Sequence, residues 1–270
     1  MLTCSRTGSA FAAKHAECVF LGGRSAAFVG EKVRKTRALA AAAGRDPNKI
    51  KFFTQFTAIL GETDEEAQEK YDRHFKYALP EGGLALFGGS SGVDISRFPI
   101  DEEFPTDPNH PLLKGLSQPQ IERLLNKPTG YTSWTPRLLT EYHAVGASGN
   151  VSVGSAVTVA DEMERFILES DIDGFNIGHV VVPQAWEDVI KYLIAELEKR
   201  GWLGENGHEY PVPGGTAREN LYGVKGESRL HSTHPGSQYK FDVYPAEPEE
   251  TVEFLGIINT KQGVFTHHSK

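Results

Sequence analysis

The segment from Cys4 to Glu17 combines residue types that can bind an anion. Ser5 places a small hydroxyl side chain just before an expected helix, and Gly8 lets the backbone approach a bound group closely. The amino end of a helix presents free backbone N–H groups, which suit a phosphate. Ser5 suits equally well a simple helix cap, a common role of serine at this position. The residue pattern alone leaves both interpretations open.

Other residues that could bind a metal or a nucleotide lack the spacing that such sites need. His231, His234 and the pair His267–His268 have no acidic or cysteine partners nearby in the sequence, so we predict no metal site. The spacing of Cys4 and Cys18 fits neither a zinc site nor a redox motif. The chain also lacks the phosphate loop of nucleoside triphosphatases.

The elements around these residues alternate between strand and helix, which is typical of parallel βαβ units. The apolar runs predict three strands, and the helical periodicity predicts several amphipathic helices. The expected strands are 18–21, 50–60 and 173–180, and the expected helices include 9–16, 25–43, a helix opening at Thr63, 155–170 and 184–200.

Two stretches break this rhythm. Residues 80–150 are rich in glycine and proline, with helices expected at 118–125 and 136–145, and an insertion of this length often serves as a lid or a binding loop. Residues 211–270 are polar, and we expect an extended or partly disordered tail with one strand at 252–258.

Composition excludes several classes of protein. The 36 acidic and 28 basic side chains give a formal net charge of −8, which argues against nucleic acid as a partner. No apolar run reaches the length of a membrane-spanning helix, so we predict no membrane association. The two cysteines favour a reducing compartment, and we expect a cytoplasmic protein.

Seven segments, in order, resemble those of one known family. The run SRTGSAFAAKHAECVF (5–20) is followed by AAAAGRDPNKIKFF (40–53), ILGETDEEAQEKY (59–71), PEGGLALFGGSSGVDIS (80–96), VGSAVTVADEMERF (153–166), DGFNI (173–177) and TARENLYG (216–223). Together they resemble the flavin-dependent monooxygenases of the nitrilotriacetate monooxygenase component A type, in the bacterial luciferase-like superfamily.

The resemblance implies an eight-stranded TIM-type (β/α)8 barrel. It also implies a two-component oxidoreductase that takes reduced FMN from a separate flavin reductase and uses O2 to oxygenate a small organic substrate. By this resemblance Ser5 contacts the FMN phosphate, and Arg6 and Thr7 assist through backbone N–H groups. The matched segments assign no catalytic residue.

His179 is a further candidate, for the substrate side of the site. It follows the strand expected at 173–180, where the carboxyl end of a barrel strand would place it on the active-site face. It could contact substrate or flavin, although a loop histidine without a functional role fits the pattern as well.

In the family, the segment around Ser5 follows the fifth strand, so the resemblance covers the C-terminal part of the barrel only. We therefore expect residues 1–210 to form a partial barrel lacking its N-terminal strands, with open sheet edges through which copies of the chain could form a homo-oligomer. Such a chain would be a truncated monooxygenase. The alternatives are a non-catalytic remnant or a βα interaction module without flavin chemistry.

Overall fold

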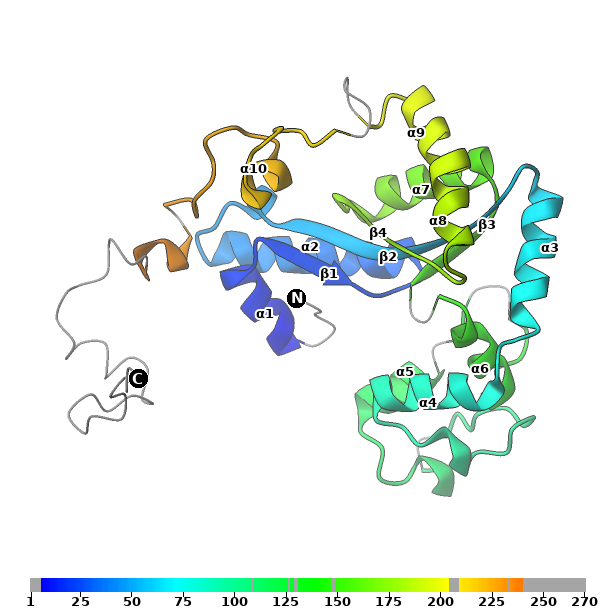
Figure 1. Cartoon of the computed structure of the whole chain (residues 1–270). Coiled ribbons are helices and arrows are strands. Elements are labelled where there is room, and N and C mark those ends of the chain that lie inside the picture. Colours follow the sequence, from blue (N-terminus) through cyan, green and yellow to red (C-terminus); the bar gives the residue numbers. More distant parts are fainter. Residues whose placement is uncertain are drawn as a thin grey trace, which may run out of the picture.

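The structure is a computed structural model that describes residues 6–107, 109–125, 127–128, 131–146, 149–203, 209–232 and 234–239. Within these residues it contains a four-stranded parallel sheet (Figure 1). The strands are β1 (Cys18–Leu21), β2 (Lys51–Gly61), β3 (Asn150–Ser155) and β4 (Gly174–Gly178). The expected α/β class with a parallel sheet is confirmed.

The long strand β2 pairs with all three others. Phe53 pairs with both β1 and β4, and Phe56 pairs with both β3 and β4. Because one residue pairs with two strands only across opposite edges, β4 runs along one edge of β2. β1 and β3 therefore follow one another along the other edge.

Helices connect the strands, and their starts agree with the caps that the sequence offers. The side chains of Ser25, Thr63 and Ser155 accept backbone N–H groups at the starts of α2, α3 and α7. The α-helices are α1 (Arg6–His15), α2 (Ala26–Ala42), α3 (Asp64–Phe75), α4 (Pro80–Ser91), α5 (Gln118–Leu125), α6 (Pro136–Ala144), α7 (Ala156–Ser170), α8 (Gln184–Asp188), α9 (Ala195–Lys199) and α10 (Ala217–Tyr222). Short 3₁₀ turns occupy Pro47–Lys49, Ile95–Arg97, Pro111–Leu113 and Pro235–Tyr239, and a π-helical stretch, Val189–Ile194, joins α8 to α9.

The two faces of the sheet differ in burial, because side chains alternate along a strand. On one face Phe52 and Phe56 are fully buried, the first against α1, α2 and α7 and the second against α7 and the α8–α9 helix. On the other face Phe20 is 38% exposed and Phe53 half-buried, with ring centroids 5.8 Å apart. One face therefore carries the core, and the other stays partly open.

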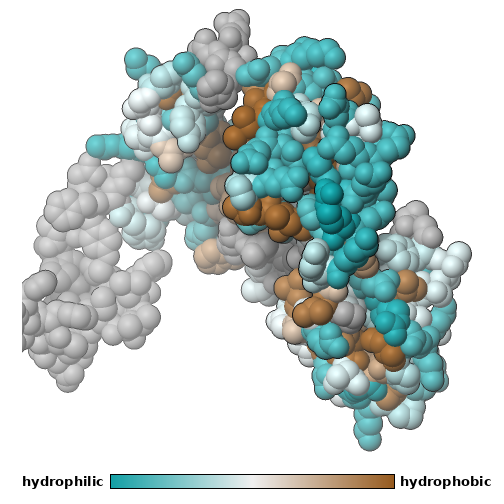
Figure 2. Space-filling view, turned by 45° about the vertical axis from the view of Figure 1, so that its right-hand side comes forward, coloured by the Kyte–Doolittle hydropathy of each residue, from teal (hydrophilic) through white to brown (hydrophobic). Residues whose placement is uncertain are grey.

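The described residues between 80 and 149 form a lobe beside the sheet (Figure 1). Its buried residues, among them Phe87, Leu124, Trp134 and Leu139, pack with one another in a cluster separate from the two clusters under the sheet. The insertion therefore has a core of its own. In the space-filling view, hydrophobic side chains also show at the surface of this lobe and of the sheet region (Figure 2).

Some sequence expectations were confirmed and others were wrong. The helices expected in the insertion at 118–125 and 136–145 are α5 and α6. The strand β3 was missed among the strands expected, because only every second side chain of its six residues is buried. The glycine-rich helix α4 was also missed, although Leu79 and Pro80 open it and Gly92 closes it with a left-handed backbone.

The C-terminal segment contains α10, which begins with a capping box between Thr216 and Glu219. The strand expected at 252–258 lies outside the described residues. Among the helices that the structure describes, none is both long and apolar enough to cross a bilayer.

Candidate functional site

The carboxyl ends of the strands carry the candidate site. Arg24 follows β1, Asp64 follows β2 and His179 follows β4. Ligands of parallel α/β proteins usually bind at this edge, because the loops there can vary while the strands hold them in place.

Asp64 ties two of these loops together. Its carboxylate accepts the Ser155 backbone N–H at 2.6 Å and the Thr158 hydroxyl at 2.8 Å. These donors stabilise the carboxylate and lower the pKa of Asp64. The amino end of α7 is thereby already occupied by an anionic group of the protein.

Lys70 lies beside the carboxyl end of β2. Its ammonium group donates to the Leu60 carbonyl at 2.8 Å and pairs with Asp188 at 3.0 Å, which joins α3 to β2 and α8. Lys70 is buried, and its bond to the Leu60 carbonyl forms away from bulk water, whereas the pair with Asp188 is partly buried. The carboxyl edge is therefore braced by charged groups from several elements.

The amino end of α1 is the expected phosphate position. Ser5 lies outside the described residues, Arg6 is the first residue of α1, and Thr7 is exposed. The first turn of α1 contains no acidic residue, so nothing in it opposes an anion. Two residues separate α1 from β1, so this amino end lies about 15 Å along the helix from the amino end of β1.

His179 directly follows β4 and is exposed, with its ring centroid 5.4 Å from that of Trp186. Among the described residues, no hydrogen bond, ion pair or ring contact joins His179 to Thr7. The structure places both candidates but does not bring them into contact.

The open face of the sheet continues toward His179 with polar side chains. Gln55 lies opposite Asn176, and Thr57 lies opposite Gly178. The Thr57 hydroxyl is buried without a hydrogen-bond partner. A Cβ atom at Gly178 would lie 2.8 Å from that hydroxyl oxygen, so any larger residue there would require the Thr57 side chain to shift.

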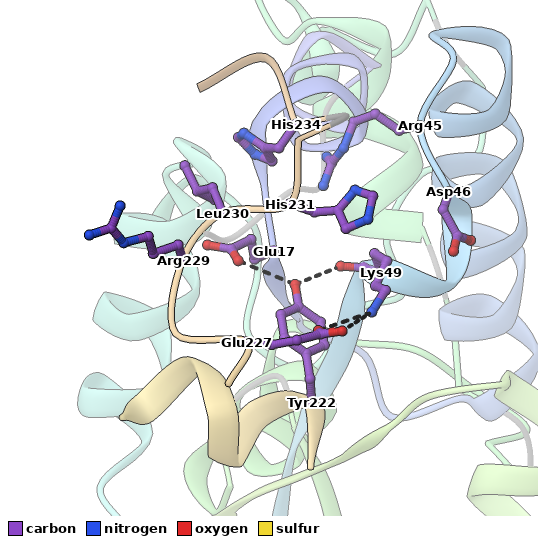
Figure 3. A pocket seen from close by; sticks show the side chains of 10 residues that line it. All are labelled: Glu17, Arg45, Asp46, Lys49, Tyr222, Glu227, Arg229, Leu230, His231 and His234. Atoms are coloured by element: carbon purple, nitrogen blue, oxygen red, sulfur yellow. Dashed lines mark hydrogen bonds and ion pairs between the residues drawn. The ribbon is translucent and has the colours of Figure 1, made fainter. Parts of the chain in front are cut away.

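A pocket at the opposite, amino edge of the sheet has a different character (Figure 3). Glu17 accepts two hydrogen bonds from Arg218, at 2.7 and 2.9 Å, and one from the Tyr222 hydroxyl at 3.3 Å. Tyr222 also donates to the Lys49 carbonyl at 2.9 Å. The lining residues are Glu17, Arg45, Asp46, Lys49, Tyr222, Glu227, Arg229, Leu230, His231 and His234.

These contacts anchor the C-terminal segment at the amino edge of the sheet. Arg45 donates to the carbonyls of Ala13 and Ala16, both at 2.9 Å, at the carboxyl end of α1. Because the amino edge of such sheets serves stability more than catalysis, we assign this pocket a structural role.

His234, a residue tested above for metal binding, uses both ring nitrogens in this pocket. Nδ1 accepts the Gly236 backbone N–H at 2.9 Å, so Nε2 carries the proton and donates to the His15 carbonyl at 3.1 Å. Within the described residues, no group of three or more potential metal ligands comes together.

Sequence reasoning missed Arg24, Asp64 and the contacts of Glu17. The sequence did mark the two residues of this ion pair, since Glu17 lies in the family-like segment 5–20 and Arg218 lies in the segment 216–223. Their contact spans 201 positions and could not be read from either segment alone.

A parallel α/β sheet with a candidate site at its carboxyl edge defines a broad class of enzymes. Within that class the chain belongs to the luciferase-like monooxygenase family, whose model matches residues 2–169. The resemblance seen in the sequence is thereby confirmed.

Curated relatives support this assignment. Dimethyl-sulfide monooxygenase from Hyphomicrobium sulfonivorans is 36% identical over 240 residues, which are 89% of this chain and 47% of that protein. Nitrilotriacetate monooxygenase component A from Aminobacter aminovorans is 30% identical over 199 residues, 73% of this chain and 43% of that protein.

A solved structure shows the same fold. The crystal structure of the riboflavin lyase RcaE, with modified FMN and riboflavin, matches with a TM-score of 0.69 and 29% identity, over 88% of this chain and 50% of that one. The chain thus spans about half the length of the relatives that it matches.

Proposed function

We propose that this chain takes part in a flavin-dependent monooxygenase reaction that uses reduced FMN. The observation that carries the proposal is the family match over residues 2–169, which includes the α1 segment expected to bind the cofactor phosphate. A related structure holds a modified FMN, which supports the choice of flavin.

The amino end of α1 fits a phosphate group, because its first turn is free of acidic side chains and Thr7 is exposed. Ser5 would bind the phosphate through its hydroxyl group, and Arg6 and Thr7 would bind it through their backbone N–H groups. Bound reduced FMN would supply the activation of O2 for oxygenation of a small organic substrate. His179, at the carboxyl end of β4, would face the substrate, and a separate flavin reductase would deliver the reduced cofactor.

The chain would supply one part of a TIM-type barrel. Residues 1–210 would form its C-terminal half, with the insertion at 80–150 and residues 211–270 as a C-terminal extension. The partly open sheet face and the half-length match to the relatives support this arrangement. A cytoplasmic location and self-association through the open sheet belong to the same proposal.

Titration of the full chain with FMN, followed by flavin fluorescence, tests the cofactor assignment. We expect Ser5→Ala to weaken FMN binding by about ten- to 150-fold, because a hydrogen bond to a charged group contributes about 1.5–3 kcal/mol. Ser25→Ala is the matched control, since it removes a hydroxyl cap of the same kind from α2.

If both variants weaken FMN binding equally, Ser5 acts only as a helix cap. A wild-type chain that leaves FMN fluorescence unchanged would overturn the proposal. A non-catalytic remnant or a βα interaction module would then be the better description.

A further inference from the structure

Arg24 joins two segments that lie far apart in the sequence. It lies three residues beyond the carboxyl end of β1, and its guanidinium sits 3.9 Å from the centroid of the Tyr142 ring in α6. The same guanidinium donates a hydrogen bond to the Val145 carbonyl, 121 positions away in the sequence. One side chain thus joins the loop after β1 to the end of the insertion.

Tyrosines from three segments interact electrostatically with this guanidinium. Tyr71 comes from α3, Tyr131 from the stretch after α5 and Tyr142 from α6, and their phenols favour the charged form of Arg24. Burial opposes this effect and lowers the pKa of Arg24 overall. A cation held over an aromatic face is more strongly attracted where it is withdrawn from water, and Arg24 is partly buried.

Two of these tyrosines, Tyr131 and Tyr142, pack against the buried cluster of the insertion. The rings of Tyr131, Trp134 and Tyr142 pack edge to face, with centroids 5.3–5.9 Å apart. Trp134 is buried, and its indole N–H donates to the Leu124 carbonyl at 3.0 Å. A group held by Tyr142 is therefore held by the core of the insertion.

The insertion otherwise stands apart from the sheet. Its buried cluster shares no member with the two clusters under the sheet, as far as the described residues show. A second close approach lies next to the first, because a Cβ atom at Gly146 would meet Val151 at 2.2 Å and Thr57 at 3.4 Å. The end of α6 is therefore the place where the lobe meets the sheet.

We propose that Arg24 is a positioning residue that holds the insertion against the carboxyl edge of the sheet, where the candidate site lies. Loss of this contact would let α6 and the loop after β1 move independently while each part keeps its own core. The inference goes beyond the proposed function, since it holds whether or not the chain binds FMN.

Hydrogen–deuterium exchange on the full chain tests this inference. In Arg24→Met we expect the amides of α6 and of residues 22–25 to exchange about tenfold faster, while amides of α5 and β2 keep their wild-type rates. Arg97→Met is the matched control. Arg97 also combines a backbone carbonyl, of Lys114, with an aromatic ring, of Phe98, but both contacts lie within the insertion.

Two variants at the aromatic side separate this contact of Arg24 from general packing. Tyr142→Phe keeps the ring face that attracts the cation, so exchange should stay close to wild type. Tyr142→Leu removes that face and should reproduce the pattern of Arg24→Met. Unchanged exchange at α6 in Arg24→Met, or equally faster exchange throughout the chain, would overturn the inference, as would equal effects of Tyr142→Phe and Tyr142→Leu.

Discussion

At the scale of single residues, Glu17 joins the two ends of the described chain. Its carboxylate accepts both hydrogen bonds of the Arg218 fork, and these contacts lower the pKa of Glu17. We expect Glu17→Gln to lower the free energy of unfolding by about 1–2 kcal/mol, measured by urea denaturation. Glu169→Gln is the control, because its pair with Arg165 lies within one helix and should cost under about 0.5 kcal/mol. Equal losses would show that the C-terminal segment is not anchored by Glu17.

Tyr222 gives the same anchor a dependence on alkaline pH. Burial, with the nearby Glu17 carboxylate, raises the pKa of Tyr222 to about 12 from an ordinary value near 10. Because the folded state holds this proton more tightly, its stabilisation is complete below about pH 10 and is lost as the pH rises toward 12. Urea unfolding between pH 9 and about 12 should show this decline, and Tyr222→Phe should make it shallower. An identical decline in both proteins would contradict the assignment.

At the scale of elements, α2 and α7 approach each other most closely at a glycine. A Cβ atom at Gly30 would lie 2.9 Å from the Glu169 carbonyl oxygen, so Gly30→Ala forces the two helices apart. We expect a loss of about 1–3 kcal/mol in the free energy of unfolding, measured by urea denaturation. In α4 a Cβ atom at Gly82 meets nothing within 4 Å. Gly82→Ala should therefore be neutral or stabilise by up to about 1 kcal/mol, and a loss there would contradict this account.

Sequence patterns predict local features of a chain, whereas the close contact at Gly30 joins two helices that lie far apart in the sequence. Caps and periodicity are local, so Ser25, Thr63 and Ser155 marked the helix starts correctly. Trp186 and Ile190 fit the apolar face expected for 184–200 yet are exposed, because the helix there includes a π-helical stretch and burial depends on neighbouring elements. The anion-binding pattern at Ser5 is likewise local. The contacts of Arg24 and Glu17 join distant segments, and no local pattern encodes them.

At the scale of the whole molecule, the two faces of the sheet differ in how deeply they bury their aromatic residues. Phe52 is fully buried under α2 and α7, whereas Phe20 is partly exposed and rests mainly on Phe53. Removal of a buried phenylalanine side chain costs about 3–5 kcal/mol, because the cavity adds to the lost burial. We expect Phe52→Ala to lose that much stability, and Phe20→Ala to lose only about 1 kcal/mol.

Urea denaturation of the two variants, combined with sedimentation at several protein concentrations, decides whether the open face stays open in solution. If the chain is a monomer, the contrast between the two losses should hold at every concentration. If copies associate through this face, Phe20→Ala should weaken the association and its stability loss should grow with protein concentration, because association stabilises the folded state by mass action. Equal losses for Phe20→Ala and Phe52→Ala in a monomeric protein would contradict the open face. The open face would then no longer support the proposal that this chain forms part of a larger barrel.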